Sequence, residues 1–360
     1  MPEPWERHFL RRRKALNELI RLAWTDPSEL KRRFPGKKLM GVFGPYVPWE
    51  PILAAGYEPV YLFPENLKPP GSQQLLPPFS CSVSRTLLDY SAGIQTGDID
   101  SLLFVQSCDA LQAVADIVSA SAADIPVYFF ALPRQFSGKT AEQFYQAELT
   151  ALAGKLGEGS AENRENAAAA AALTGTLLAG LYRYRLHFTA FQFYSLLRAV
   201  HFLPKDFVTR HLTKILSDLE TQSSPPIQGP QSRLFLIGSH LPGRLILEAV
   251  DEAGAQVTGE MIDLGLAAMT QSPFPGEPLP GTHNSRLARR YVLRKKIKDS
   301  GADGVLFYRQ KYCDPHGFDS ADLSDLCRKE KIPFLNLELD RQADSGRIST
   351  RLEAFMEMLG

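Results

Sequence analysis

Short apolar runs alternate with helical patterns in two separate parts of the chain. In the first part, the runs are residues 38–43, 60–63, 102–105 and 127–130. In the second part, they are residues 233–238, 256–260, 305–308 and 334–338. Strands that alternate with amphipathic helices in this way are typical of parallel sheets with right-handed crossovers. We therefore predict an α/β fold with two Rossmann-like parallel-sheet lobes.

Two further segments lack strand patterns and are predicted to be helical. The first ends at Pro35-Gly36, and the second extends from about residue 140 to the Ser-Ser-Pro-Pro break at residues 223–226. We predict an N-terminal helical segment at residues 1–35, a first α/β lobe at 36–139, a helical insert between the lobes at 140–222, and a second α/β lobe at 223–360. In the second lobe, the pattern predicts a helix at residues 322–331, after a loop that follows Cys313.

The same Cys-Asp pair follows one strand of each predicted lobe. Cys108-Asp109 follows the run at residues 102–105, and Cys313-Asp314 follows the run at residues 305–308. Ligands of open parallel sheets bind just beyond the carboxyl ends of the strands. We therefore expect each lobe to present one thiol at its rim, and two facing rims would form a site for a group that binds sulfur.

Composition and charge narrow the choice of partners. The chain has 40 basic and 40 acidic residues, and this balance makes nucleic acid an unlikely partner. No signal peptide and no apolar stretch long enough to cross a bilayer is visible, so we expect a cytoplasmic protein without membrane contact. The four cysteines would then be reduced thiols, available for metal binding, for catalysis or for burial.

A third thiol shares the predicted environment of Cys108 and Cys313. Cys81 follows a Pro-Pro-Phe-Ser segment and precedes a helical pattern, whereas Cys327 lies inside a helix and is expected to be structural. A cysteine taken alone is more often a buried apolar residue than a ligand, but amide groups at a helix start stabilise a thiolate. Three thiolates without a Cys-x-x-Cys pair suit an iron–sulfur cluster with one open iron better than structural zinc.

Two other side chains at the predicted rims have two interpretations each. Glu50 follows the first strand and is either an acid–base group or a carboxylate facing solvent. His316 is either part of the site beside Cys313 or a loop histidine in solvent. The sequence contains neither a G-x-G-x-x-G dinucleotide motif at a strand end nor a phosphate loop.

Taken together, these residues resemble a known family over the chain from about Lys38 to its end. The resemblance is carried by Tyr46-Val47-Pro48-Trp49-Glu50, by the segments around the three cysteines, by Ile332-Pro333-Phe334-Leu335 with Glu338 and Asp340, and by the segment at residues 350–355. The chain resembles the subunits of 2-hydroxyacyl-CoA dehydratases and benzoyl-CoA reductases. It differs from the family pattern at Gly44-Pro45, where a more polar stretch is usual.

The resemblance implies a cofactor, partners and a reaction. Cys81, Cys108 and Cys313 match the positions that hold a [4Fe-4S] cluster, and Glu50 matches a residue near the substrate pocket. An ATP-dependent iron–sulfur activator protein would supply a low-potential electron, which would pass to the thioester carbonyl of an acyl-CoA and form a ketyl radical anion. A paralogous second subunit would complete the enzyme.

Two alternative functions stay open. One is a homodimeric reductase of small molecules that holds a double-cubane cluster through the same cysteines. The other is a non-catalytic two-lobed binding protein. The presence of all three cysteines counts against the second alternative, because a degenerate family member would be expected to lose them.

Overall fold

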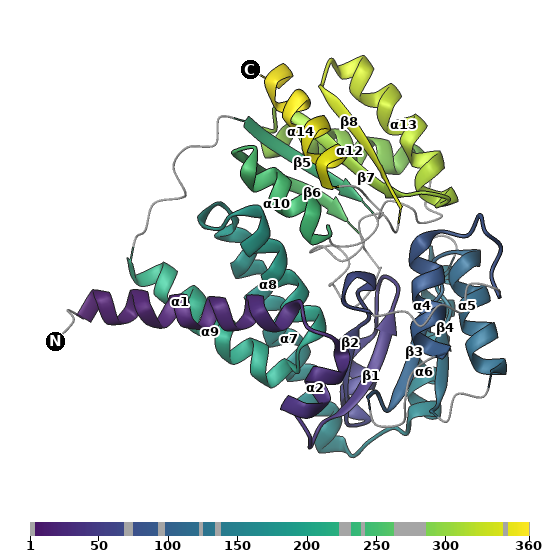
Figure 1. The fold of residues 1–360 in the computed structure, drawn as a ribbon. Coiled ribbons are helices and arrows are strands. Elements are labelled where there is room, and N and C mark those ends of the chain that lie inside the picture. Colours follow the sequence, from purple (N-terminus) through teal and green to yellow (C-terminus); the bar gives the residue numbers. More distant parts are fainter. Residues whose placement is uncertain are drawn as a thin grey trace.

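The computed structural model describes residues 4–67, 75–92, 98–121, 125–133, 138–222, 232–238, 242–262, 286–340 and 345–359. It contains two four-stranded parallel sheets, which confirms the predicted α/β fold with two lobes (Figure 1). The first sheet comprises β1 (Lys38–Phe43), β2 (Tyr57–Tyr61), β3 (Ser101–Val105) and β4 (Val127–Phe130), in the order β2-β1-β3-β4.

The second sheet repeats the arrangement of the first. It comprises β5 (Ser232–Gly238), β6 (Ala255–Ile262), β7 (Gly304–Gln310) and β8 (Phe334–Leu339), in the order β6-β5-β7-β8. In these two orders β3 and β7 occupy equivalent places, beside the central strands β1 and β5. Cys108 and Cys313 therefore follow equivalent strands of the two lobes.

Helices connect the strands within each lobe. The first lobe contains α3 (Trp49–Ala54), the short 3-10 helix η1 (Pro64–Asn66), α4 (Ser82–Ala92) and α5 (Asp109–Ala120). The second contains α10 (Arg244–Glu252), α12 (Arg286–Ser300), α13 (Asp314–Glu330) and α14 (Ser345–Leu359). The predicted start of the helix at residue 322 is wrong, because α13 begins at Asp314, directly after Cys313. Pro315 is compatible with this start, because the first turn of a helix has no hydrogen-bond partner for its N–H groups.

The remaining helices precede β1 or lie between β4 and β5 in the sequence. They are α1 (Pro4–Ala23), α2 (Pro27–Arg33), α6 (Lys139–Leu156), α7 (Ala161–Arg183), the 3-10 helix η2 (Arg185–His187), α8 (Ala190–Phe202) and α9 (Lys205–Gln222). Helices α1, α8 and α9 pack together and lie on the left in Figure 1, whereas α6 packs against β4 and α3 of the first lobe. Across the described ranges, no helix has both the length and the apolar character that a membrane span requires.

Both faces of the second sheet are covered, which explains its nearly continuous apolar strands. Leu234 and Leu236 of β5 face the larger core, which includes side chains of α10 and α14. Phe235 and Ile237 of the same strand face the opposite way, in a second core with side chains of α12 and α13. This alternation follows from the two-residue period of a strand.

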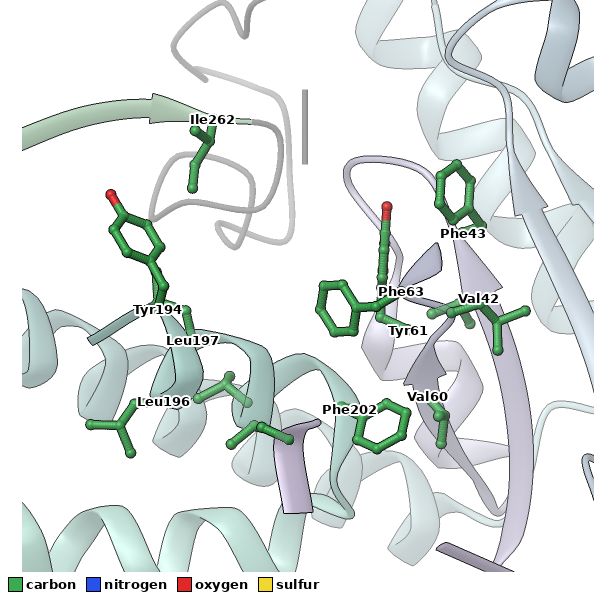
Figure 2. Close-up of a cluster of buried hydrophobic side chains, with 14 of the residues drawn as sticks. Val42, Phe43, Val60, Tyr61, Phe63, Tyr194, Leu196, Leu197, Phe202 and Ile262 are labelled. Carbon is green, nitrogen blue, oxygen red and sulfur yellow. The ribbon is translucent and has the colours of Figure 1, made fainter. Parts of the chain in front are cut away.

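Helix α8 joins the cores of the two lobes. Its residues 193–202 are all buried. Phe202 packs near Phe63 at the end of β2, with ring centroids 6.4 Å apart, and Tyr194 lies toward Ile262 at the end of β6 (Figure 2). The larger core thus extends from the first sheet through α8 to the second sheet, and the helical insert fixes how the lobes are placed.

A buried polar cluster also links the insert to the second lobe. The carboxylate of Glu260 on β6 accepts hydrogen bonds from the hydroxyls of Tyr182 and Tyr194, and it pairs with Arg185 at 3.1 Å. Burial, followed by the negative charge of Glu260, raises the pKa of both tyrosines well above the usual value. The hydroxyls therefore stay protonated and able to donate to the carboxylate.

Candidate functional site

Cys108 lies at the start of α5, as the sequence predicts. It is the N-cap residue, with extended backbone angles of φ −156° and ψ 166°, and its side chain is half-buried. Asp109 follows in the first turn, where a negative charge is favourable. The local sequence thus places a thiol beside the free N–H groups of a helix start.

The electrostatic surroundings of Cys108 show that a second thiol is close. Burial raises the pKa of the Cys108 thiol, whereas the backbone amide of Leu111 lowers it, and the Cys81 thiol raises it again. The helices that begin after these two cysteines, α4 and α5, pack against each other. The first lobe therefore brings Cys81 and Cys108 together from positions 27 residues apart in the sequence.

Cys81 is held by contacts within its own turn. The N–H group of Ser84 donates to the Cys81 sulfur at 3.4 Å, and the Ser84 hydroxyl donates to the Cys81 carbonyl at 2.9 Å. Ser84 is buried. These two hydrogen bonds fix the position of the Cys81 sulfur relative to the first turn of α4.

Cys313 is the N-cap residue of α13 in the second lobe. Its carbonyl accepts a hydrogen bond of 2.8 Å from the N–H group of Gly317. Tyr312, directly before it, has a φ of 62°, which a bulky residue rarely adopts. Such backbone strain is often found at functional sites.

Polar contacts connect the segment before Cys313 with the start of α4. The hydroxyl of Ser82 donates to Oε1 of Gln310 at 2.8 Å. The carboxylate of Asp340, just after β8, pairs with Arg85 of α4 at 3.7 Å and with Lys311 at 3.8 Å. Figure 1 shows α4 next to the ends of β7 and β8. The rims of the two lobes therefore meet beside Cys81 and Cys313.

The donor set fits a cluster better than a single metal ion. The described part of the chain contains no group of three or more His, Cys, Asp or Glu residues arranged to hold a metal ion. In an iron–sulfur cubane each cysteine binds a different iron, so the thiolates need not be as close as the ligands of one ion. Three half-buried thiols, each directly before a helix, are suited to that arrangement.

Glu50 lines a cavity that does not include the cysteines. It is exposed in the first turn of α3 and lines a cavity of about 310 Å³, together with residues of α6, Glu158 of the α6–α7 loop and Arg164 of α7. None of the three cysteines lines this cavity. Burial, and secondly the charge of Glu50, raise the pKa of Tyr145 on α6 above its usual value.

The other two candidate residues are buried. His316 is only 2% exposed and lies in α13 rather than in a loop, with its ring centroid 6.0 Å from that of Phe307. The interpretation of His316 as a loop histidine in solvent is therefore wrong. Cys327 is fully buried in the second core, and burial raises the pKa of its thiol to about 11. Its surroundings agree with the structural role expected for it.

Known proteins match the chain over most of its length. The sequence model of the family described as 2-hydroxyglutaryl-CoA dehydratase, D-component, matches residues 45–359. The beta subunit of (R)-2-hydroxyglutaryl-CoA dehydratase from Acidaminococcus fermentans is 24% identical, over 91% of this chain and 94% of that protein. The beta subunit of lactoyl-CoA dehydratase from Anaerotignum propionicum is 22% identical, over 90% and 92%. One of the subunits of benzoyl-CoA reductase from Thauera aromatica is 20% identical, over 88% and 89%.

The matched region of the family model contains all three candidate cysteines and Glu50. It also contains every strand of the two sheets except β1, which ends just before it. The relatives are dehydratases and reductases, which supports an enzymatic function of one of these types. The chain belongs to the 2-hydroxyglutaryl-CoA dehydratase D-component family.

Proposed function

We propose that this chain is the iron–sulfur subunit of a radical 2-hydroxyacyl-CoA dehydratase or of a benzoyl-CoA-type reductase in the cytoplasm. In this proposal Cys81, Cys108 and Cys313 hold a [4Fe-4S] cluster. The observation that carries it is the meeting of the lobes beside these thiols: the helices that follow Cys81 and Cys108 pack together, and the Ser82–Gln310 hydrogen bond links their rim to the strand that leads to Cys313.

The chain itself would prepare the three thiols for metal binding. Each thiol lies directly before a helix, where the first N–H groups have no partner within the helix. The Ser84 N–H group donates to the Cys81 sulfur, and hydrogen bonds to cluster sulfurs tune the reduction potential. When bound, the cluster would supply one-electron transfer at low potential to an acyl-CoA thioester.

Partners follow from the names of the relatives. Each relative is named as one subunit of a dehydratase or reductase, so each works within a larger enzyme. We propose that this chain likewise pairs with a second, paralogous subunit and receives its electron from an ATP-dependent iron–sulfur activator protein.

We propose Glu50 as a proton-transferring group, because it lines a cavity large enough for part of a substrate.

Turnover of two substrate classes tests the proposal. The chain, purified without oxygen together with its partner and activator, should release water from a 2-hydroxyacyl-CoA or reduce benzoyl-CoA. Cys313→Ser should abolish turnover, whereas Cys327→Ser, a matched change on α13, should retain it. Equal activity of the two variants would contradict the assignment of Cys313.

A second pair of variants tests Glu50. Glu50→Gln should lower kcat and leave the iron content unchanged, because the carboxylate is proposed to move a proton and not to bind metal. Glu142→Gln, which alters an exposed carboxylate of α6 outside that cavity, is the matched control and should keep kcat close to wild type. An unchanged kcat in Glu50→Gln would exclude the proposed role.

A further inference from the structure

Five polar residues join the two lobes directly beside the candidate cysteines. We name them the rim clamp: Ser82, Arg85, Gln310, Lys311 and Asp340. The clamp has two parts, which are the Ser82–Gln310 hydrogen bond of 2.8 Å and the carboxylate of Asp340 shared between Arg85 at 3.7 Å and Lys311 at 3.8 Å. The first two residues belong to the first lobe, and the other three belong to the second.

The first-lobe side of the clamp is rigidly connected to Cys81. Ser82 is the next residue in the chain, and Arg85 lies one helical turn further along α4. The Arg85 N–H group donates to the Cys81 carbonyl at 3.2 Å. A displacement of this part of α4 would therefore move the Cys81 thiol with it.

The second-lobe side is connected to Cys313 in the same way. The Cys313 N–H group donates to the Gln310 carbonyl at 3.2 Å, so the turn between them is closed. The Lys311 N–H group donates to the carbonyl of Leu339 at 2.8 Å, which holds the segment against the end of β8 and next to Asp340. Ser82 and Arg85 thus lie within about one turn of Cys81, and Gln310 and Lys311 lie within about one turn of Cys313.

The two parts of the clamp differ in burial and charge. Ser82 is 5% exposed and Gln310 is half-buried, so their hydrogen bond is partly shielded from water. Asp340 is 41% exposed, and its two long ion pairs are weaker individually. They join Arg85, on the helix that follows Cys81, to the segment that leads to Cys313.

We propose that the rim clamp is a positioning device, which sets the separation between Cys313 and the Cys81–Cys108 pair so that all three thiolates can bind one cluster. This inference rests on the proposed function, because it assumes that the three cysteines share a cluster. It assigns a role to residues that touch neither the substrate nor the metal: they act through the placement of the cysteines.

Loss of iron to a chelator tests the clamp without relying on enzyme activity. The anaerobically purified protein with its cluster is mixed with a ferrous-iron chelator, and the rate of iron release is followed by absorbance. Gln310→Met and Asp340→Asn should each release iron about twofold to tenfold faster than wild type, as expected from the loss of one modest polar interaction. Asp340→Glu, which keeps the charge, should restore most of the wild-type rate.

Matched controls remove similar interactions that stay within the second lobe. Ser320→Ala deletes a side-chain hydrogen bond of the same length, the 2.8 Å bond from Asn336. Asp303→Asn deletes an ion pair of 3.0 Å with Arg233. Both controls should release iron at the wild-type rate. Thermal unfolding of every variant by circular dichroism identifies any protein that is not folded, and such a variant is replaced by Gln310→Glu or Ser82→Ala.

A second measurement distinguishes positioning from general weakening. Electron paramagnetic resonance of the reduced cluster should show shifted or broadened signals in the clamp variants and an unchanged spectrum in the two controls. Wild-type rates and spectra in Gln310→Met and Asp340→Asn, with a cluster present in wild type, would overturn the clamp alone. Wild-type protein without iron and sulfide would overturn the proposed function, and with it the clamp.

Discussion

The buried Glu260 cluster provides a quantitative test of how the helical insert is joined to the second lobe. Glu260 and Arg185 have side-chain exposures of only 5% and 11%. Removing one partner of a buried ion pair leaves an uncompensated charge and costs about 3–5 kcal/mol. A glutamine at position 260 keeps an acceptor for one tyrosine hydroxyl, so we expect Glu260→Gln to lower the free energy of unfolding by about 3 kcal/mol, near the lower end of this range.

The assay is urea unfolding of the metal-free chain, followed by circular dichroism at neutral pH. Glu248→Gln is the control, because Glu248 forms an exposed ion pair of 2.7 Å with Arg244 on α10. Exposed pairs of this kind contribute about 0.3–0.5 kcal/mol. Replacing both partners, as in Glu260→Leu with Arg185→Met, should recover much of the loss. Similar losses for Glu260→Gln and Glu248→Gln would refute the description of this cluster as a buried, charge-balanced link.

Three further changes have defined outcomes. Burial lowers the pKa of Lys205 from 10.5 to about 8, so between these pH values the unfolded chain binds a proton that the folded chain has released. The free energy of unfolding should therefore rise with pH in wild type. Urea titrations at several pH values should show this rise in wild type and not in Lys205→Met. Cys327→Ser should lower the free energy of unfolding by about 1–3 kcal/mol, because a hydroxyl is buried in an apolar core, and should leave the iron content unchanged in an iron assay. Gly44→Ala should cost about 1–3 kcal/mol in thermal or urea unfolding, because Gly44 has a φ of 110° and a Cβ there would lie 2.6 Å from the Val105 carbonyl oxygen.

The sequence was sufficient to predict the fold because its strands are apolar and separated by regular helices. β1 and β4 begin and end where the pattern placed them. β2 begins three residues earlier than predicted, since Pro59 suggests a break; the strand lies at the edge of the sheet, where a residue without an N–H group is tolerated. α13 was predicted to start too late for a related reason, because Pro315 and Gly317 resemble a loop but fall in its first turn.

Local features of the candidate site were also predictable, whereas contacts between distant segments were not. The placement of Cys108 before a helix follows from a few neighbouring residues, whereas the helix after Cys313 starts eight residues earlier than the pattern predicted. The Ser82–Gln310 hydrogen bond joins residues 228 positions apart, and no local pattern identifies such a pair. The sequence contains one indication that these residues matter: Asp340 and the segment around Arg85 both carry the family resemblance. The lobe limits at residues 35, 139 and 222, and the ligand role of the cysteines, stay predictions.

Iron and sulfide content is the most direct test of the central claim that Cys81, Cys108 and Cys313 together hold one cluster. The wild-type chain and a variant with all three cysteines changed to serine are purified without oxygen and assayed side by side, with Cys327→Ser as the control. The account predicts about four irons and four sulfides per wild-type chain and per control chain, and none in the triple variant. Equal iron in the triple variant and wild type, or a folded wild-type chain that binds no iron, would contradict it.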